Sequence, residues 1–143
     1  MNEAPPRTAL RAGLWLLAVS LPLGLTLEAL HAWKVPVYLG SALRREMWTL
    51  AHAHGNLLGI LCLAMAAVGK HLALDGARRR RLERWLAVGA WTMPLGFLLG
   101  GVGNREGDPS LGIVLVPIGG VVVFVALMQA ALAAGRPPLD SAG

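Results

Sequence analysis

Two histidines and an asparagine, His52, His54 and Asn56, stand near the start of a long apolar run. Polar side chains are costly in hydrocarbon, so an intramembrane pair of histidines is by default a hypothesis for a functional site. Neutral imidazole is a ligand for transition metals and for heme iron, and a Glu–His pair is suited to acid/base chemistry. A third interpretation, a hydrogen-bond network between helices, stays open beside these two.

Helical geometry separates the two histidines. Trp48, His52 and Asn56 recur at intervals of four residues and therefore form one stripe on a helix. His54 lies about 200° around the helix from His52, since each residue turns the helix by about 100°. We therefore expect one histidine to face a pocket and the other to pack against a neighbouring element.

A second polar group precedes this segment, in Glu28 and His31, which are three residues apart and share a helix face. Glu28 stands five residues before Trp33, and His52 stands four residues after Trp48. With a rise of about 1.5 Å per residue, both groups lie roughly 6 Å inside an interface marked by tryptophan. Their similar depth makes them candidates for one site.

The composition indicates which elements must position these residues. The chain has 143 residues, a size typical of one domain, and is 55% hydrophobic and 15% charged. A membrane span needs roughly 20 apolar residues, and no alternating strand pattern competes. We predict an all-α protein, an integral membrane four-helix bundle forming a single domain over residues 1–143, with four spans at approximately 9–30, 47–69, 85–103 and 111–134.

The charge pattern predicts an orientation. The net charge is +5, and four consecutive arginines at 78–81, followed by Arg84, lie between the second and third predicted spans. Short loops rich in Lys and Arg stay in the cytoplasm, which predicts a multi-pass protein of a bacterial-type inner membrane with both termini cytoplasmic. The Pro-rich tail at 136–143 is expected to be a disordered end. The apolar spans make the lipid bilayer the expected partner, and no nucleic-acid motif is present.

Several classes of site are excluded by the residue types. Cys62 is the only cysteine, which excludes an intrachain disulfide and a multi-cysteine metal site; we expect it to act as a small apolar side chain. No phosphate loop, dinucleotide fingerprint or Ser/His/Asp arrangement occurs. Gly55-x-x-x-Gly59 and Gly96-x-x-x-Gly100 have the spacing that allows close helix contact.

The pattern around these residues resembles the small four-helix membrane isomerases typified by styrene oxide isomerase, with hydroxylaminobenzene mutase as a relative. Ala51-His52 followed by Gly59 is similar to the motif that opens the second helix of that family. The segment from Trp91 to Gly96-Phe97 resembles an element of its third helix, and Gly107-Asp108 precedes a fourth span as in the family. The resemblance extends over most of the chain.

This resemblance implies a homotrimer with heme b between helices of neighbouring protomers and His52 as the axial ligand of the iron. Ferric heme would act as a Lewis acid on the oxygen of a small hydrophobic epoxide, and a 1,2-shift would give an aldehyde. Glu28 and Asn56 are then the candidate catalytic groups in the same pocket. His31, His54 and Asp108 are candidates for supporting roles around it.

The chain departs from the family at two positions, Leu58 and Leu98. The family carries Asn and Tyr there, and both are thought to position substrate, so the resemblance covers the scaffold and the heme better than the reaction. Two alternatives stay open: a non-catalytic heme or metal protein for redox chemistry or sensing, and an accessory membrane subunit.

Overall fold

The computed structural model describes residues 7–105 and 107–135, and over these residues the protein is all-helical, as predicted. Strand-type pairing in this part of the chain is limited to an isolated bridge between Arg105 and Asp108. The predicted tail at 136–143 lies outside the described residues. The elements in order are α1 (Thr8–Ala32), α2 (Pro36–Leu39), α3 (Ala42–Val68), the 3₁₀ helix η1 (Gly69–His71), α4 (Gly76–Gly100), the 3₁₀ helix η2 (Leu111–Val114) and α5 (Leu115–Ala134).

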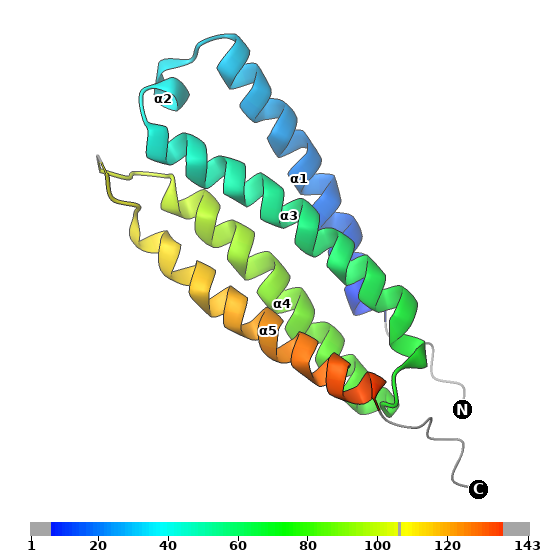
Figure 1. Cartoon of the computed structure of the whole chain (residues 1–143). Coiled ribbons are helices and arrows are strands. Elements are labelled where there is room, and N and C mark those ends of the chain that lie inside the picture. Colours follow the sequence, from blue (N-terminus) through cyan, green and yellow to red (C-terminus); the bar gives the residue numbers. More distant parts are fainter. Residues whose placement is uncertain (1–6, 106, 136–143) are drawn as a thin grey trace, which may run out of the picture.

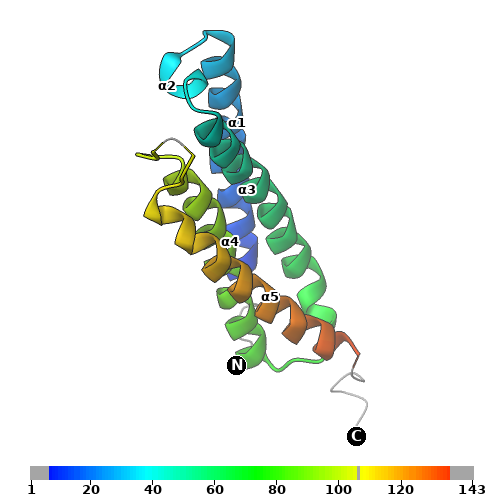
Figure 2. The same cartoon turned by 60° about the vertical axis from the view of Figure 1, so that its left-hand side comes forward.

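The four long helices lie side by side in the order α1, α3, α4, α5 (Figure 1), and the turned view keeps the same neighbours (Figure 2). Helices α3 and α4 are central, and α1 also contacts α4. The short helix α2 and the connection between α4 and η2 lie at one end of the molecule, while α1 begins and α5 ends at the other. We call the first of these the α2 end. We call the other the arginine end, because α4 begins there with the arginine run at 78–81.

Three segments are long and apolar enough to cross a membrane: α1, α3 with η1 (Ala42–His71), and η2 with α5 (Leu111–Ala134). The fourth predicted span, at 85–103, does not meet the same criterion of length and composition. Helix α4 begins at Gly76, so its first turns contain the arginine run and Glu83. The apolar remainder, at 85–100, is about 24 Å long, which is shorter than a hydrocarbon core of about 30 Å.

Small residues bring neighbouring helices into close contact. A Cβ added at Gly13 of α1 would lie 2.7 Å from the Gly59 carbonyl oxygen of α3, and one added at Gly96 of α4 would lie 2.8 Å from the Val116 nitrogen of α5. These distances confirm the close contacts predicted at Gly59 and Gly96. Cys62 is fully buried in the core beside Leu58, in agreement with its expected role as a small apolar residue.

Candidate functional site

The side chain of His52 crosses from α3 to the backbone of α1. Its Nδ1 lies 2.7 Å from the Ser20 carbonyl oxygen. A carbonyl oxygen only accepts, so Nδ1 carries the proton and donates, and the lone pair of the neutral ring is on Nε2. Histidines that bind metals commonly donate their other ring N–H to a backbone carbonyl in this way. His52 is thus held with Nε2 as its ligand or base atom.

Small residues on both helices make room for this contact. A Cβ at Gly24 of α1 would overlap the His52 ring, with 2.7 Å to Nδ1, and a Cβ at Gly55 of α3 would overlap the Ser20 hydroxyl. The imidazole therefore occupies the space in front of Gly24. Gly55 was recognisable from its spacing, but Gly24 and Ser20 become visible only once α1 is placed against α3.

His52 and Glu28 line the same hollow at the α2 end. The hollow has a volume of about 470 Å³. Its lining residues are Leu21, Gly24, Leu25, Leu27, Glu28, Tyr38, Thr49 and His52. Glu28 is exposed, and its carboxylate has no hydrogen bond or ion pair with any described residue. A mostly apolar hollow with a few convergent polar groups is the common form of a small-molecule site.

Asn56 contacts His52 and is not among the residues that line this hollow. Its amide nitrogen lies 3.3 Å from each ring nitrogen of His52, so it can donate to the lone pair on Nε2. The Asn56 Oδ1 atom is buried and has no partner among the described residues. An unpaired buried acceptor is unusual, and here it belongs to the side chain whose amide contacts His52.

His54 faces the other side of α3. Its Nδ1 lies 2.9 Å from the Leu50 carbonyl oxygen, and its ring packs against Phe97 of α4 at 4.7 Å between centroids. The predicted division is therefore confirmed: one histidine lines a hollow and the other packs against a neighbouring helix. His54 is directed away from the hollow in which His52 lies.

Tyr38, which lines the hollow, lies between two other aromatic rings. His31 is exposed and meets Tyr38 edge-on at 6.4 Å, and Tyr38 stacks on Trp48 at 6.1 Å. Tyr38 is only 5% exposed. It lies in α2, between the first two predicted spans, where the sequence analysis expected no helix although Pro36 at the first helical position is typical of a helix start. The structure thus adds Tyr38 to the predicted site residues.

Trp48 and Arg44 fasten this end of α3 to the end of α4. The Trp48 Nε1 atom donates to the Leu98 carbonyl oxygen at 3.1 Å. Arg44 Nε donates to the Gly101 carbonyl oxygen at 2.9 Å, its Nη2 donates to Asn104 Oδ1 at 3.1 Å, and the guanidinium lies over the Trp48 ring. These bonds hold the first turns of α3, the helix that carries Thr49 and His52 of the hollow, against the end of α4.

The structure does not bring Asp108 to His52. Asp108 is exposed in the connection after α4, where its backbone nitrogen donates to the Arg105 carbonyl oxygen at 3.0 Å. It lines a different hollow, together with Arg105 and Leu111. Within a single chain, Asp108 therefore makes no contact with His52 that would support its predicted role.

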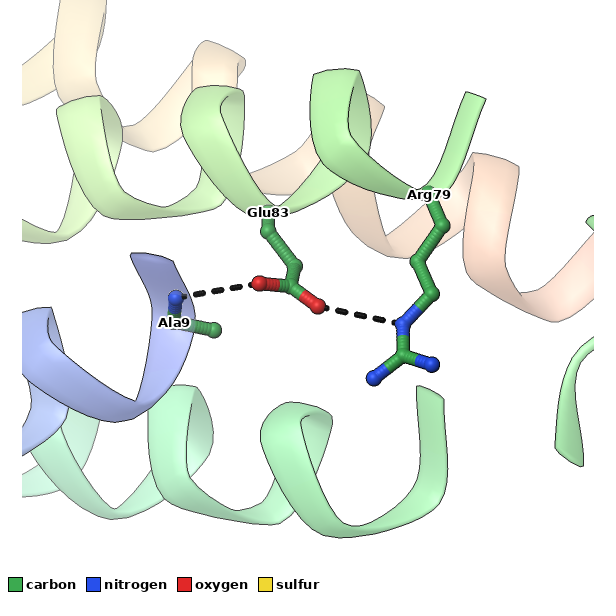
Figure 3. Close-up of polar contacts among 3 residues, drawn as sticks. All are labelled: Ala9, Arg79 and Glu83. Carbon is green, nitrogen blue, oxygen red and sulfur yellow. Dashed lines mark hydrogen bonds and ion pairs between the residues drawn. The ribbon is translucent and has the colours of Figure 1, made fainter. Parts of the chain in front are cut away.

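At the arginine end, Glu83 forms a polar cluster that the sequence interpretation missed (Figure 3). Glu83 is 1% exposed, and its carboxylate accepts from the Ala9 backbone nitrogen at 3.3 Å and from Arg79 Nε at 3.2 Å. Arg79 and Glu83 are four residues apart, a spacing that predicts a pair on one helix face. One arginine of the basic run therefore serves helix packing.

The residues that the structure describes contain no group of three or more His, Cys, Asp or Glu side chains arranged to hold a metal ion. Comparison of the chain with protein-family models, with curated proteins and with solved structures gives no match.

Proposed function

We propose that this protein is an integral membrane four-helix bundle that binds heme b through His52 and isomerises a small hydrophobic epoxide to a carbonyl compound. The observation that carries the proposal is the bond from His52 Nδ1 to the Ser20 carbonyl oxygen, which leaves the lone pair of the ring on Nε2 of a histidine that lines an apolar hollow. The resemblance to styrene oxide isomerase supplies the reaction class.

The membrane part of the proposal rests on exposed apolar side chains. Three helices are long and apolar enough to span, and large apolar residues such as Leu25 and Phe124 point outward, 73% and 62% exposed. In this arrangement α4 is the fourth span, with its arginines at the boundary. Long Arg side chains reach the interface from such positions. The arginine end would then be cytoplasmic, together with both termini.

The donor set fits heme better than a bare metal ion. A site built only from protein ligands needs three or four donors, and the described residues offer no such group. A porphyrin supplies four nitrogens itself, so one imidazole suffices to hold it. Leu21 and Leu25 on the wall of the hollow are apolar and exposed in the single chain. A homotrimer that covers them with a neighbouring protomer would complete a closed pocket.

The residues of the chain have distinct roles in this proposal. His52 holds the heme, and Ser20 fixes the tautomer of His52. The Asn56 amide, which lies 3.3 Å from both ring nitrogens of His52, would supply a hydrogen-bond donor for a substrate oxygen beside His52. Glu28, on the wall of the hollow, can accept or return a proton. Bound ferric heme supplies a Lewis acid for the epoxide oxygen. The leucine walls of the hollow would exclude water from the reacting substrate.

An absorption spectrum of the detergent-purified protein, oxidised and then reduced with dithionite, tests the cofactor. We expect a Soret band corresponding to about one heme per chain, loss of heme in His52→Ala, and retention of heme in His54→Ala as the matched control. A protein that stays colourless when hemin is supplied during expression would refute the proposal.

The reaction has its own test. Purified protein is mixed with styrene oxide, and phenylacetaldehyde is measured by gas chromatography. Turnover that disappears in His52→Ala supports the isomerase. A heme that binds without turnover, and whose spectrum ignores epoxides and amines, indicates the non-catalytic redox or sensor protein instead. Absence of heme and turnover leaves an accessory subunit, whose polar groups join helices.

A further inference from the structure

A small notch lies between the first turns of α4 and the last turns of α5 at the arginine end. Its volume is about 240 Å³. The lining residues combine two guanidinium groups and an amide with apolar side chains: Leu74, Arg78, Arg81, Gln129, Leu132 and Ala133. Charged and apolar walls thus meet in one concavity between two helices, which is the form expected for a lipid headgroup with its first methylene groups.

Among the residues that the structure describes, acidic side chains neutralise the positive charge of the notch only in part. Glu83, the nearest acidic residue on α4, is 1% exposed and is bonded to Ala9 and Arg79. Asp75 pairs with Arg78 at 3.2 Å, but both side chains are more than half exposed, and such pairs are weak. Arg81 has no hydrogen bond or ion pair with any residue that the structure describes. Its guanidinium therefore remains available to an anion.

Arg81 also lines a second hollow on the same helix end, with Arg80, Arg84, Trp85 and Val88. Trp85 is 50% exposed and Leu132, beside the first notch, is 62% exposed. Tryptophan is enriched at the level of lipid headgroups. The notch therefore lies at the depth where a phosphate can meet the arginines while an acyl chain follows Leu132 along α5.

We propose that the notch between α4 and α5 binds an anionic phospholipid, with Arg78 and Arg81 on the phosphate, Gln129 on a headgroup oxygen and Leu132 against the acyl chain. Guanidinium groups match phosphate oxygens through paired N–H donors. The apolar half of the lining is what favours a lipid over a free phosphate ion. The inference needs only that this end faces a membrane surface, and it is independent of heme and of any reaction.

Native mass spectrometry of the full-length protein in a neutral detergent tests the proposal, with short-chain phosphatidylglycerol as the probe and the matching phosphatidylcholine as the neutral lipid. We expect wild-type protein to retain phosphatidylglycerol in preference to phosphatidylcholine. A guanidinium group in direct contact with the phosphate contributes about 1 kcal/mol or more, which is roughly fivefold in affinity. Arg81→Gln should therefore weaken phosphatidylglycerol binding about fivefold, and Arg78→Gln/Arg81→Gln about 25-fold.

Arg84→Gln is the matched control, because it removes the same charge from the same helix outside the notch. We expect it to change the affinity less than about twofold at this surface position. Equal losses from Arg81→Gln and Arg84→Gln would show general electrostatic attraction and would overturn the assigned site. Gln129→Ala changes no charge and should still weaken binding two- to tenfold, the range of about one hydrogen bond; unchanged binding would also overturn it.

Competition separates the two sources of phosphate. Glycerol phosphate carries the headgroup chemistry without acyl chains, so it should displace the lipid only at far higher concentration. Displacement at a concentration equal to that of the lipid would mean that the notch binds a free phosphate compound, and the lipid assignment would be wrong. All variants are compared by size-exclusion chromatography, so that a loss of binding is not confused with a loss of folding.

Discussion

At the arginine end the buried carboxylate of Glu83 is bonded to Arg79 and to Ala9, and it is 1% exposed. At the α2 end the polar groups are incomplete: Glu28 is exposed without a partner, and Asn56 Oδ1 is buried without one. These partners were sought among residues 7–105 and 107–135. Both regions place ionisable groups between helices, yet only the first is fully paired.

The difference separates a structural cluster from a candidate site. A buried ion pair is tolerated only when its hydrogen bonds are satisfied, and Glu83 also bonds an N–H at the start of α1 that no helical carbonyl can reach. A buried acceptor without a partner costs free energy in a folded protein. Asn56 Oδ1 is such an acceptor among the described residues, and it belongs to the side chain that contacts His52, which is consistent with the ligand site proposed at the α2 end.

The largest expected effect comes from breaking the Glu83 cluster. Glu83→Ala leaves the Arg79 charge uncompensated and the Ala9 N–H without its acceptor, so we expect a loss of about 3–5 kcal/mol in the free energy of unfolding. Unfolding of the purified protein by denaturant in detergent measures it. Asp75→Ala, which removes an exposed pair with Arg78, is the control and should cost less, although it also removes the helix cap.

The same variant checks the separation of the two regions. The fraction of Glu83→Ala protein that stays folded should bind as much heme as wild type. Loss of heme without loss of stability would mean that Glu83 belongs to the functional site. The distinction between a structural cluster at the arginine end and a candidate site at the α2 end would then be wrong.

Gly24→Ala should have the next largest effect, because the new Cβ would overlap the His52 ring. Overpacking of this kind costs about 1–3 kcal/mol, and displacement of His52 should also lower heme content strongly. Gly120→Ala is the matched control, since its Cβ meets only the flexible end of Met93, at 3.3 Å. Heme content measured by absorbance and stability measured by unfolding should fall together in Gly24→Ala and stay near wild type in Gly120→Ala.

Trp48→Phe sharpens the comparison at the α2 end. Phenylalanine keeps an aromatic ring against Tyr38 but loses the bond from Trp48 Nε1 to the Leu98 carbonyl oxygen. We expect a loss of about 1 kcal/mol in the free energy of unfolding, the usual contribution of one hydrogen bond. Tyr38→Phe, whose ring keeps the same stacking, should leave stability within about 0.5 kcal/mol of wild type. Equal destabilisation by both variants would argue against this role of the indole N–H.

Helical periodicity explains what the sequence could predict. The helices, the opposite directions of His52 and His54, and the close contacts at Gly59 and Gly96 all follow from residue spacing within one helix. The start of α4 was not predicted from the sequence, because the predicted span began at the apolar residues near 85. The helix starts at Gly76, after Asp75, whose side chain accepts from the Arg78 backbone nitrogen at 2.8 Å.

The missed parts of the site depend on contacts between distant residues. Ser20 and His52 are 32 positions apart, and Ala9 and Glu83 are 74 positions apart. No spacing rule identifies such partners before the helices are packed. Tyr38 was missed for another reason, because a four-residue helix is too short to produce a periodic pattern.

Asn56→Leu should have the smallest effect on stability, and it tests directly whether Asn56 differs from the fully bonded Glu83. Asn56→Leu removes the amide contact to His52 together with the unpaired Oδ1 atom. Loss of one contact and removal of one unsatisfied acceptor oppose each other, so stability should change by less than about 1 kcal/mol. Heme should still bind, because His52 and Ser20 are unchanged, while epoxide turnover should fall if the amide meets the substrate. A loss of several kcal/mol would instead mean that Asn56 is as fully bonded as Glu83. The α2 end would then be a second structural cluster, and the polar groups around His52 would need no ligand to explain them.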